Sequence, residues 1–403
     1  MSSPLAAGLP VVPVLALTTA TQSLTTLGAV ALAAVAPAAA LDLGVSPALI
    51  GYQIGVLYVG AMLAALVGGG LARRLGATRT SQLALWLVAA GCLVSALSTL
   101  PTLALGALVM GLGYGITNPA ASQLLARAPT ARNMNLIFSI KQCGVPIGGV
   151  LSGALVPALA LAFGWQASLA ACALLAVGLS LAMGPVRPRW DTDRDAAAPV
   201  MAAPLASLAL VWRHKTLRWL AFASFAYSAV QLSLTGFLVT YLVTEVQLSL
   251  LVAGTILAVT HAAGAAGRLA WGWLADRIRS GTAALIANGA VALAGALATA
   301  AIVAGWPVWA IAAATSIFGF SAIGWNGVFM AVIARQSAPQ DIAIATGGTL
   351  SVTFAGVIVG PSAFAALHDH AELSYSTGYA LLALVTALGV ACILRSRRVG
   401  SRR

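Results

Sequence analysis

Long apolar stretches alternate with short polar segments along the whole chain. Turn residues divide them into twelve stretches, over residues 11–36, 48–70, 80–100, 102–126, 134–157, 165–184, 217–242, 250–273, 282–304, 307–333, 343–366 and 376–394. Each stretch is close to the roughly 20 apolar residues that an α-helix needs to cross a bilayer. The pattern therefore predicts an all-α polytopic membrane protein with twelve transmembrane helices.

Composition supports the same fold class. The chain has 403 residues, of which 60% are hydrophobic and only 7% are charged, whereas soluble domains have about 25% charged residues. Its richness in small residues favours close helix packing, and the alternating ten-residue segments of an outer-membrane barrel are absent. The first apolar stretch lacks a basic leader and is too long for a signal peptide, so we expect it to remain as the first helix.

The distribution of charge explains the net charge of +12. Basic residues gather in alternate loops and in the C-terminal tail, at Arg73–Arg79, Arg127–Arg132, Arg187–Arg218, Arg277–Arg279, Arg335 and Arg395–Arg403. The intervening loops contain Asp42, Glu245, Asp369 and Glu372 but no Lys or Arg. This alternation follows the positive-inside rule. It predicts a plasma membrane (bacterial inner membrane) protein with both termini in the cytoplasm, and it argues against nucleic-acid binding.

The chain also repeats itself on either side of one long polar segment. The segment GGLARRLG (Gly69–Gly76) is matched by GWLADRIR (Gly272–Arg279). Asn118 and Asn326 each lie nine residues before an Arg, and Gln22 in the first helix matches Gln231 in the seventh. Parallel repeats of this kind occur in two-lobed transporters. We therefore expect two pseudo-symmetric six-helix bundles, residues 1–184 and 217–403, joined by a cytoplasmic linker over residues 185–216.

In these two loop motifs the chain resembles the major facilitator superfamily, whose pattern is G-x-L-a-D-R-x-G. The second copy keeps Asp276 and Arg277, whereas the first has Arg73 where the family has Asp. The resemblance implies transport by alternating access. It also implies a gating role for the loop residues Gly69, Arg73, Arg74, Gly76, Gly272, Asp276 and Arg277. The replacement at position 73 removes the acid that is held to make an inter-lobe contact in the family.

Two cations, Lys141 and Arg268, lie inside predicted helices that contain no Asp or Glu. A charge in the membrane interior is costly and is a functional-site hypothesis by default. At 1.5 Å of rise per residue, both lie about 12 Å from the basic end of their helices. Polar residues in six helices share this depth, where transporters bind substrate. They are Gln22, Asn118, Lys141, Gln231, Arg268 and Asn326.

Arg268 is the leading candidate for binding an anion. A guanidinium can hold a carboxylate through two parallel hydrogen bonds. Its position, one turn before Gly272, is similar to that of the eighth-helix Arg in the monocarboxylate and oxalate–formate branches of the family, which implies a carboxylate contact. The alternative is that Arg268 extends to the cytoplasmic face or braces the loop.

Lys141 has two interpretations. It could make a second anion contact or change its protonation as the substrate arrives, and it could instead hydrogen-bond neighbouring helices and stabilise the bundle. Thr353 occupies the repeat-related position, so a cationic site would be asymmetric. His261 shares a helix face with Arg268, and we consider it as a coupling residue or as a packing residue.

Glycine and proline in the fifth and eleventh helices predict hinge or close-packing positions. In the fifth helix they resemble the family's antiporter motif, although Val145 separates the Gly-Pro pair. Such residues relax the helix or allow close helix approach. The positions are Gly144, Pro146, Gly148, Gly149, Gly360 and Pro361. Tyr58 and Trp325 are expected to line the cavity and shape its apolar part.

These features favour a secondary transporter of a small organic anion, a mono- or dicarboxylate, and small-anion permeases such as cyanate carriers also fit. The runner-up is efflux of amphipathic drugs or metabolites, and a third class is a non-transporting receptor or scaffold. The chain has no Walker motif, and the four cysteines lack metal or CxxC spacing. We therefore expect neither an enzyme nor a bound cofactor or metal, and a monomer that works in the lipid bilayer.

Overall fold

The structure is a computed structural model that describes residues 9–127, 140–198, 200, 204–337 and 342–400. Within these residues, twelve helical spans are long and apolar enough to cross a membrane. The helices are α1 (Val11–Ala34), α2 (Ala36–Leu43), η1 (Pro47–Leu49), α3 (Ile50–Leu75), α4 (Ala77–Ser95), α5 (Leu100–Ala126), α7 (Gly144–Phe163), α8 (Trp165–Ala182), α9 (Arg187–Trp190), α10 (Pro204–Arg213), α11 (Lys215–Thr244), α12 (Leu250–Arg277), α13 (Gly281–Ala300), α14 (Val308–Ala322), α15 (Asn326–Arg335), α16 (Ile342–Ala371) and α17 (Tyr375–Gly400). The expected fold class, an all-α protein with twelve transmembrane helices, is confirmed.

Two spans are interrupted next to polar residues. The fifth begins at Ile140 among the described residues, turns at Cys143 and continues as α7. Its predicted start, at residue 134, lies outside the described residues. The tenth is broken between α14 and α15, over residues 323–325. Backbone carbonyls freed at such breaks need other hydrogen-bond donors inside a membrane. At each of these two breaks, Arg268 donates to one such carbonyl.

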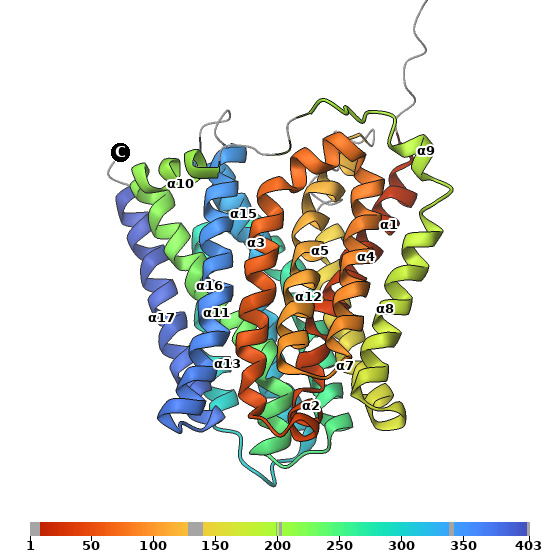
Figure 1. Ribbon diagram of the computed structural model, residues 1–403. Helices are drawn as coiled ribbons and strands as arrows, with labels where there is room; N and C mark the ends of the chain where they lie inside the picture. Colours follow the sequence, from red (N-terminus) through yellow and green to blue (C-terminus); the bar gives the residue numbers. More distant parts are fainter. Residues whose placement is uncertain (1–8, 128–139, 199, 201–203, 338–341, 401–403) are drawn as a thin grey trace, which may run out of the picture.

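The helices form two six-helix bundles (Figure 1). In the N-terminal bundle, α5 packs along α3 and α4; in the C-terminal bundle, α11 packs along α16 and α17. The most extensive contacts between the bundles are those of α7 with α12 and of α3 with α16, and α11 also packs against α1, α2 and α3. Local signals set several helix starts, since Thr99, Ser249 and Ser280 accept hydrogen bonds from first-turn amides of α5, α12 and α13.

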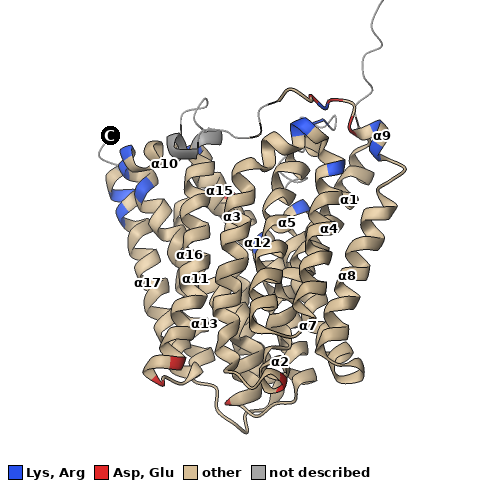
Figure 2. Cartoon of the chain, viewed as in Figure 1, with Lys and Arg blue, Asp and Glu red and all other residues tan. Residues whose placement is uncertain are grey.

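The two ends of the bundles carry different charges (Figure 2). Lys and Arg gather at one end, here named the basic end, where α3, α5, α12 and α15 finish. Asp42, Glu245, Asp369 and Glu372 lie at the opposite end, here named the acidic end. Three further acids lie in the linker and contact residues at the basic end. They are Asp191, Asp193 and Asp195.

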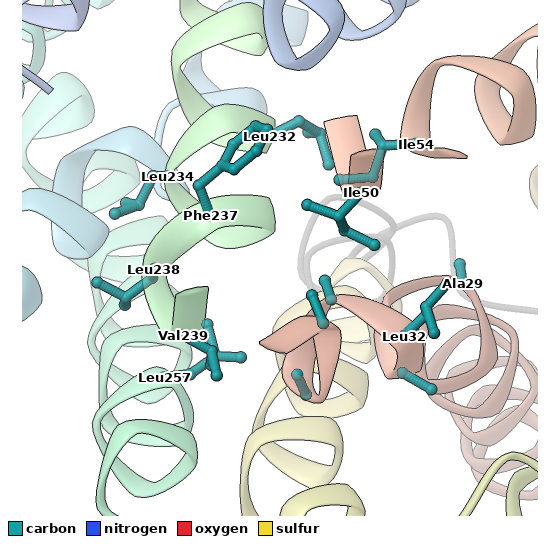
Figure 3. Packing of buried hydrophobic residues seen from close by; sticks show 14 of the residues in the cluster. Ala29, Leu32, Ile50, Ile54, Leu232, Leu234, Phe237, Leu238, Val239 and Leu257 are labelled. Atoms are coloured by element: carbon teal, nitrogen blue, oxygen red, sulfur yellow. The ribbon is translucent and has the colours of Figure 1, made fainter. Parts of the chain in front are cut away.

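Contacts between the bundles close the acidic end. Apolar residues of α1, α3, α11 and α12 form one buried cluster there, including Leu32, Ile50, Phe237 and Leu257 (Figure 3). Ser46 donates a hydrogen bond to Asp369 Oδ1 at 2.6 Å, from the N-terminal to the C-terminal bundle. Burial of apolar side chains stabilises this closure by about 25 cal/mol for each Å² removed from contact with solvent.

The linker is bound to the N-terminal bundle by hydrogen bonds and an ion pair at the basic end. Asp191 accepts hydrogen bonds from the backbone amides of Thr78 (2.7 Å) and Arg79 (3.0 Å). Both amides lie in the first turn of α4, where the helix itself provides no acceptor. Asp193 pairs with Arg127 at 2.6 Å. Further along, α10 packs against α16 of the other bundle. The linker therefore contacts both bundles.

Candidate functional site

A cavity of about 580 Å³ lies between the two bundles. Its wall is built from α1, α3, α5 and the start of the fifth span on one side, and from α11, α12, α15 and α16 on the other. It extends toward the basic end, where Ser122 near the end of α5 and Gly347 near the start of α16 belong to its lining. None of the described residues that line it is Asp or Glu. The cavity has the size of typical ligand sites, which are roughly 300–1,000 Å³.

Lys141 is the centre of a polar cluster in the N-terminal bundle. The residue is 2% exposed, and its ammonium donates to three amide oxygens: Gln22 Oε1 at 2.9 Å, Gln142 Oε1 at 3.3 Å and Asn118 Oδ1. An ammonium has three N–H donors, so all three are used. Neutral oxygens satisfy the hydrogen bonds but leave the positive charge uncompensated.

The C-terminal bundle carries a related cluster without a cation. Gln231 Oε1 accepts hydrogen bonds from Trp325 Nε1 at 2.9 Å and from Asn326 Nδ2 at 3.2 Å. Gln231 and Asn326 are the repeat-related positions of Gln22 and Asn118. Thr353, at the position that corresponds to Lys141, instead donates to Ser224 at 2.9 Å. The two bundles therefore share a Gln–Asn pair, and Lys141 makes the N-terminal one cationic.

Arg268 connects the two bundles. From α12 its Nη1 donates to the backbone carbonyl of Gln142 at 2.8 Å, and its Nε donates to the carbonyl of Ile323 at 3.2 Å. Each carbonyl belongs to one of the interrupted spans. A guanidinium has five N–H groups; two are engaged here, so three have no partner within the described residues. Arg268 also lines the cavity.

His261 lies two turns from Arg268 on α12 and also lines the cavity. It is 5% exposed, and neither ring nitrogen has a hydrogen-bond partner within the described residues. Its ring packs directly on Gly149 of α7, because a Cβ at Gly149 would lie 2.2 Å from His261 Nδ1. The imidazole is therefore placed at the contact between the bundles.

Aromatic rings form another part of the cavity wall. The Tyr58 ring centroid lies 5.7 Å from that of Tyr114 and 6.0 Å from that of Phe354. These residues come from α3, α5 and α16, so both bundles contribute. Trp325 also borders the cavity, but it is 1% exposed and its Nε1 is bound to Gln231. Its polar atom therefore supports the wall.

Other residues singled out in the sequence lie around this centre. Gln22 is fully buried behind Lys141 and is absent from the described cavity lining. Gly148 packs on the Ser23 carbonyl of α1, Gly144 packs on Gln22, and Gly360 packs on Ala229. Pro146 lies in the first turn of α7, and because it has no N–H it leaves the carbonyl of Gln142, four residues earlier, without a helical partner. Pro361 lies inside α16.

The loop-motif residues lie at the basic end, outside the cavity lining. Arg73, Arg74 and Gly76 end α3, and Gly76 has a φ of +102°, which favours glycine. Gly69 and Gly272 have open space where a Cβ would be. Asp276 pairs with Arg335 at 3.8 Å on the surface, whereas the backbone carbonyl of Arg73 accepts from the linker amide of Asp195 at 2.9 Å.

Three residues of the site, Gln142, Tyr114 and Phe354, were not selected from the sequence. Gln142 acts through both its side chain and its backbone carbonyl. The available signals were its position next to Lys141 and Pro146 four residues later, whose missing N–H frees the Gln142 carbonyl. Within the described residues, no group of three or more His, Cys, Asp or Glu could hold a metal ion.

Comparisons with known proteins place this geometry in context. The chain is 25% identical over 264 residues to a hexuronate transporter of Bacillus subtilis, matching 63% of this chain and 61% of the relative. It is 31% identical over 137 residues to the 4-hydroxybenzoate transporter PcaK of Acinetobacter baylyi, and 30% identical over 161 residues to plastidic glucose transporter 4 of Arabidopsis thaliana. The last two matches span 33% and 38% of this chain and 29% of each relative. The matches thus cover less than two thirds of each relative.

Solved structures share the fold at low sequence identity. A variant of the nucleoside transporter NupG superimposes with a TM-score of 0.75 at 15% identity, over 95% of this chain and 99% of that one. An inward-facing, occupied bacterial homologue of the human lysosomal transporter Spinster gives a TM-score of 0.74 at 15% identity, over 96% of each chain. The family model of the Major Facilitator Superfamily matches residues 18–361. With this match over most of its length, the chain belongs to the Major Facilitator Superfamily of membrane transporters.

Proposed function

We propose that this chain is a secondary transporter that moves a small organic anion, a mono- or dicarboxylate, across the bacterial inner membrane by alternating access. The observation that carries the proposal is Arg268, which lines a cavity without acids and keeps three N–H groups without partners among the described residues. A carboxylate satisfies a guanidinium through paired, charge-assisted hydrogen bonds. Two of the three relatives are named for organic acids, hexuronate and 4-hydroxybenzoate.

In this proposal the polar residues have different roles. Arg268 binds the carboxylate, while Asn118, Gln231 and Asn326 contribute amide groups. Lys141, whose three donors are occupied, adds positive potential and braces the N-terminal bundle together with Gln22. Tyr58 and Trp325 shape the wall. An efflux pump for cationic drugs would be served poorly by this lining, because it offers cations and no carboxylate.

In this proposal, substrate binding also changes a hydrogen bond between the two bundles and so is coupled to their movement. Arg268 holds the neutral carbonyl of Gln142 across the bundle interface. A carboxylate is a stronger acceptor than a carbonyl, because hydrogen bonds to charged groups contribute about twice as much as neutral ones. When substrate takes over this donor, the bond between the bundles is exchanged for a bond to substrate. The bundles, residues 1–184 and 217–403, then rock about the cavity, with residues 185–216 as linker.

Orientation follows from the distribution of charge. With the basic end in the cytoplasm, as the positive-inside rule favours, the cavity extends toward the cytoplasm and the closed acidic end faces outward. His261, at the contact with Gly149, is the candidate for proton coupling. Loss of pH-gradient-driven uptake in His261→Asn, with exchange retained, would support that role, and unchanged gradient dependence would remove it. The carrier acts as a monomer in this proposal.

The test is uptake of radiolabelled carboxylates by purified protein in proteoliposomes. We expect saturable uptake that Arg268→Ala lowers by about tenfold or more, because a lost charge-assisted hydrogen bond contributes about 1.5–3 kcal/mol. Arg279→Ala, an exposed cation just beyond the same helix, is the matched control. Unchanged carboxylate uptake in Arg268→Ala would contradict the site. Export of neutral or cationic amphiphiles without carboxylate uptake would favour the efflux function.

A further inference from the structure

The two cations differ in what they can still bind. All three donors of Lys141 are taken by Gln22, Asn118 and Gln142. Arg268 keeps three donors without partners within the described residues. A second carboxylate would have to displace an amide oxygen from Lys141 and leave that oxygen buried. The site therefore has one position, at Arg268, where an anion can bind without displacing a hydrogen bond of Lys141.

Several polar atoms around the cavity already have partners in the protein. Gln231 Oε1 is shared by Trp325 and Asn326. Ser228 donates to the Thr353 carbonyl at 2.8 Å, and Thr353 donates to Ser224. A polyhydroxylated ligand needs many partners, and buried hydroxyls without them are costly. Beside Arg268, the wall leaves such a ligand chiefly the amide groups of Asn118, Gln231 and Asn326.

Aromatic surface is what the cavity offers beside Arg268. Tyr58 contacts both Tyr114 and Phe354, with ring planes inclined at 61° and 52°. Tyr114 and Arg268 line the same cavity. Inclined rings of this kind accept a further ring in edge-to-face or offset geometry. A planar ring carrying one carboxylate could therefore contact the aromatic residues while its carboxylate meets the guanidinium.

We propose that the substrate is an aromatic monocarboxylate, with its carboxylate on Arg268 and its ring against the aromatic subsite formed by Tyr58, Tyr114 and Phe354. This inference rests on the proposed transport of organic anions and narrows it to one substrate class. Tyr58 is the specificity-determining residue, because it alone of the three contacts both other rings. Since Phe354 belongs to the other bundle, the subsite is complete only while α3 and α16 stay together.

The experiment makes two measurements with four acids. The first is how far each acid raises the melting temperature of the purified full-length protein, and the second is how strongly each acid inhibits uptake of a radiolabelled carboxylate. The probes are benzoate, cyclohexanecarboxylate of similar size, succinate with two carboxylates, and glucuronate with several hydroxyls. We expect benzoate to bind best and cyclohexanecarboxylate to bind about tenfold more weakly, because it lacks the ring quadrupole. Tyr58→Leu should remove the preference for benzoate over cyclohexanecarboxylate, and Arg268→Ala should abolish binding of both.

The outcomes separate the two proposals. If succinate or glucuronate binds more tightly than benzoate and still depends on Arg268, the aromatic class is wrong and organic-anion transport stands. If no acid binds in a manner that depends on Arg268, the proposed function itself fails. Should Tyr58→Leu fold poorly, Phe354→Leu tests the same subsite from the other bundle. The ranking of acids by the unaltered protein requires no variant.

Discussion

Arg268 of the C-terminal bundle donates a hydrogen bond to the backbone carbonyl of Gln142 in the N-terminal bundle. The acceptor has no helical partner because Pro146, four residues later, lacks an N–H, and the second acceptor of Arg268, the carbonyl of Ile323, is freed by the break before α15. One cation therefore serves two helix breaks in different bundles. Its replacement would therefore affect the bundle contact as well as the proposed binding of an anion.

Arg268→Lys tests that double role. An ammonium is a point charge without the planar fork of a guanidinium, and it reaches one acceptor more easily than two. We expect the variant to retain charge yet bind carboxylates about tenfold more weakly, consistent with the loss of one charge-assisted hydrogen bond. The measurement is the KM for uptake in proteoliposomes. A KM equal to that of the unaltered protein would mean that charge alone suffices.

A disulfide between α3 and α16 should lock the acidic end. A Cβ on Gly55 would lie 2.6 Å from Ser362 Oγ, so the two side chains would face each other, as a disulfide requires. We expect the Gly55→Cys, Ser362→Cys pair to form on oxidation and to stop transport while ligand still binds from the basic end. Reduction should restore transport, and each single-cysteine variant is the control. Transport by the fully oxidised pair would show that this end need not open.

The charge on Lys141 can be cancelled without disturbing its geometry. Gln22→Glu would put a carboxylate where Gln22 Oε1 now accepts from Lys141 at 2.9 Å. We expect a fold at least as stable, because a buried cation gains an opposite charge, and weaker anion uptake, because the positive potential falls. Gln22→Met is the control, since it removes the amide but keeps the charge. If the Met variant lowers uptake more than the Glu variant, the potential is not what attracts the anion.

The contact between His261 and Gly149 should show strong coupling. Adding a methyl group at Gly149 would place it against the His261 ring, and overpacking of this kind typically costs about 1–3 kcal/mol. We expect Gly149→Ala to lower thermal stability and transport, and His261→Ala in the same chain to recover much of the stability. A double-mutant cycle of apparent melting temperatures measures the effect. Additive losses would show that the ring and the glycine do not restrain each other.

Asp191 should stabilise α4 from outside the N-terminal bundle. It accepts from two first-turn amides, at Thr78 and Arg79, and its charge suits a helix N-terminus. We expect Asp191→Ala to destabilise the protein by about 1–3 kcal/mol, because two donors lose their partner. Asp195→Ala is the control, as its described side-chain bond is to the nearby Ala197 amide. Equal melting temperatures for the two variants would contradict this capping role.

The hydrophobic pattern was sufficient for the fold because a bilayer imposes one helix length and satisfies no backbone group. It also indicated depth, so Lys141, Asn118 and Gln22 were expected at one level. A pattern of this kind does not give the direction in which each side chain points around its helix. Gln22 therefore turns out to lie behind Lys141, outside the described cavity lining.

Other features depend on contacts that no single segment encodes. The pairing of Tyr58 with Phe354 joins residues 296 positions apart (354 minus 58), across the bundle interface. The turn at Cys143 was not predicted, because it lies inside an apolar stretch whose hydrophobic pattern predicts one continuous helix. The first loop motif has no Asp, and the acid on α4 comes from the linker at Asp191. Sequence alone gave no reason to connect the two.

The uncompensated charge of Lys141 has an electrical consequence. When Lys141 is protonated, it and Arg268 give the empty cavity two positive charges, and no acid lines its described wall. A bound monocarboxylate lowers this to one (two minus one). A transmembrane voltage acts on moved charge by about 2.3 kcal/mol per elementary charge for each 100 mV. In the proposed transport cycle, the voltage therefore acts more strongly on the return of the empty carrier than on the movement of the loaded one.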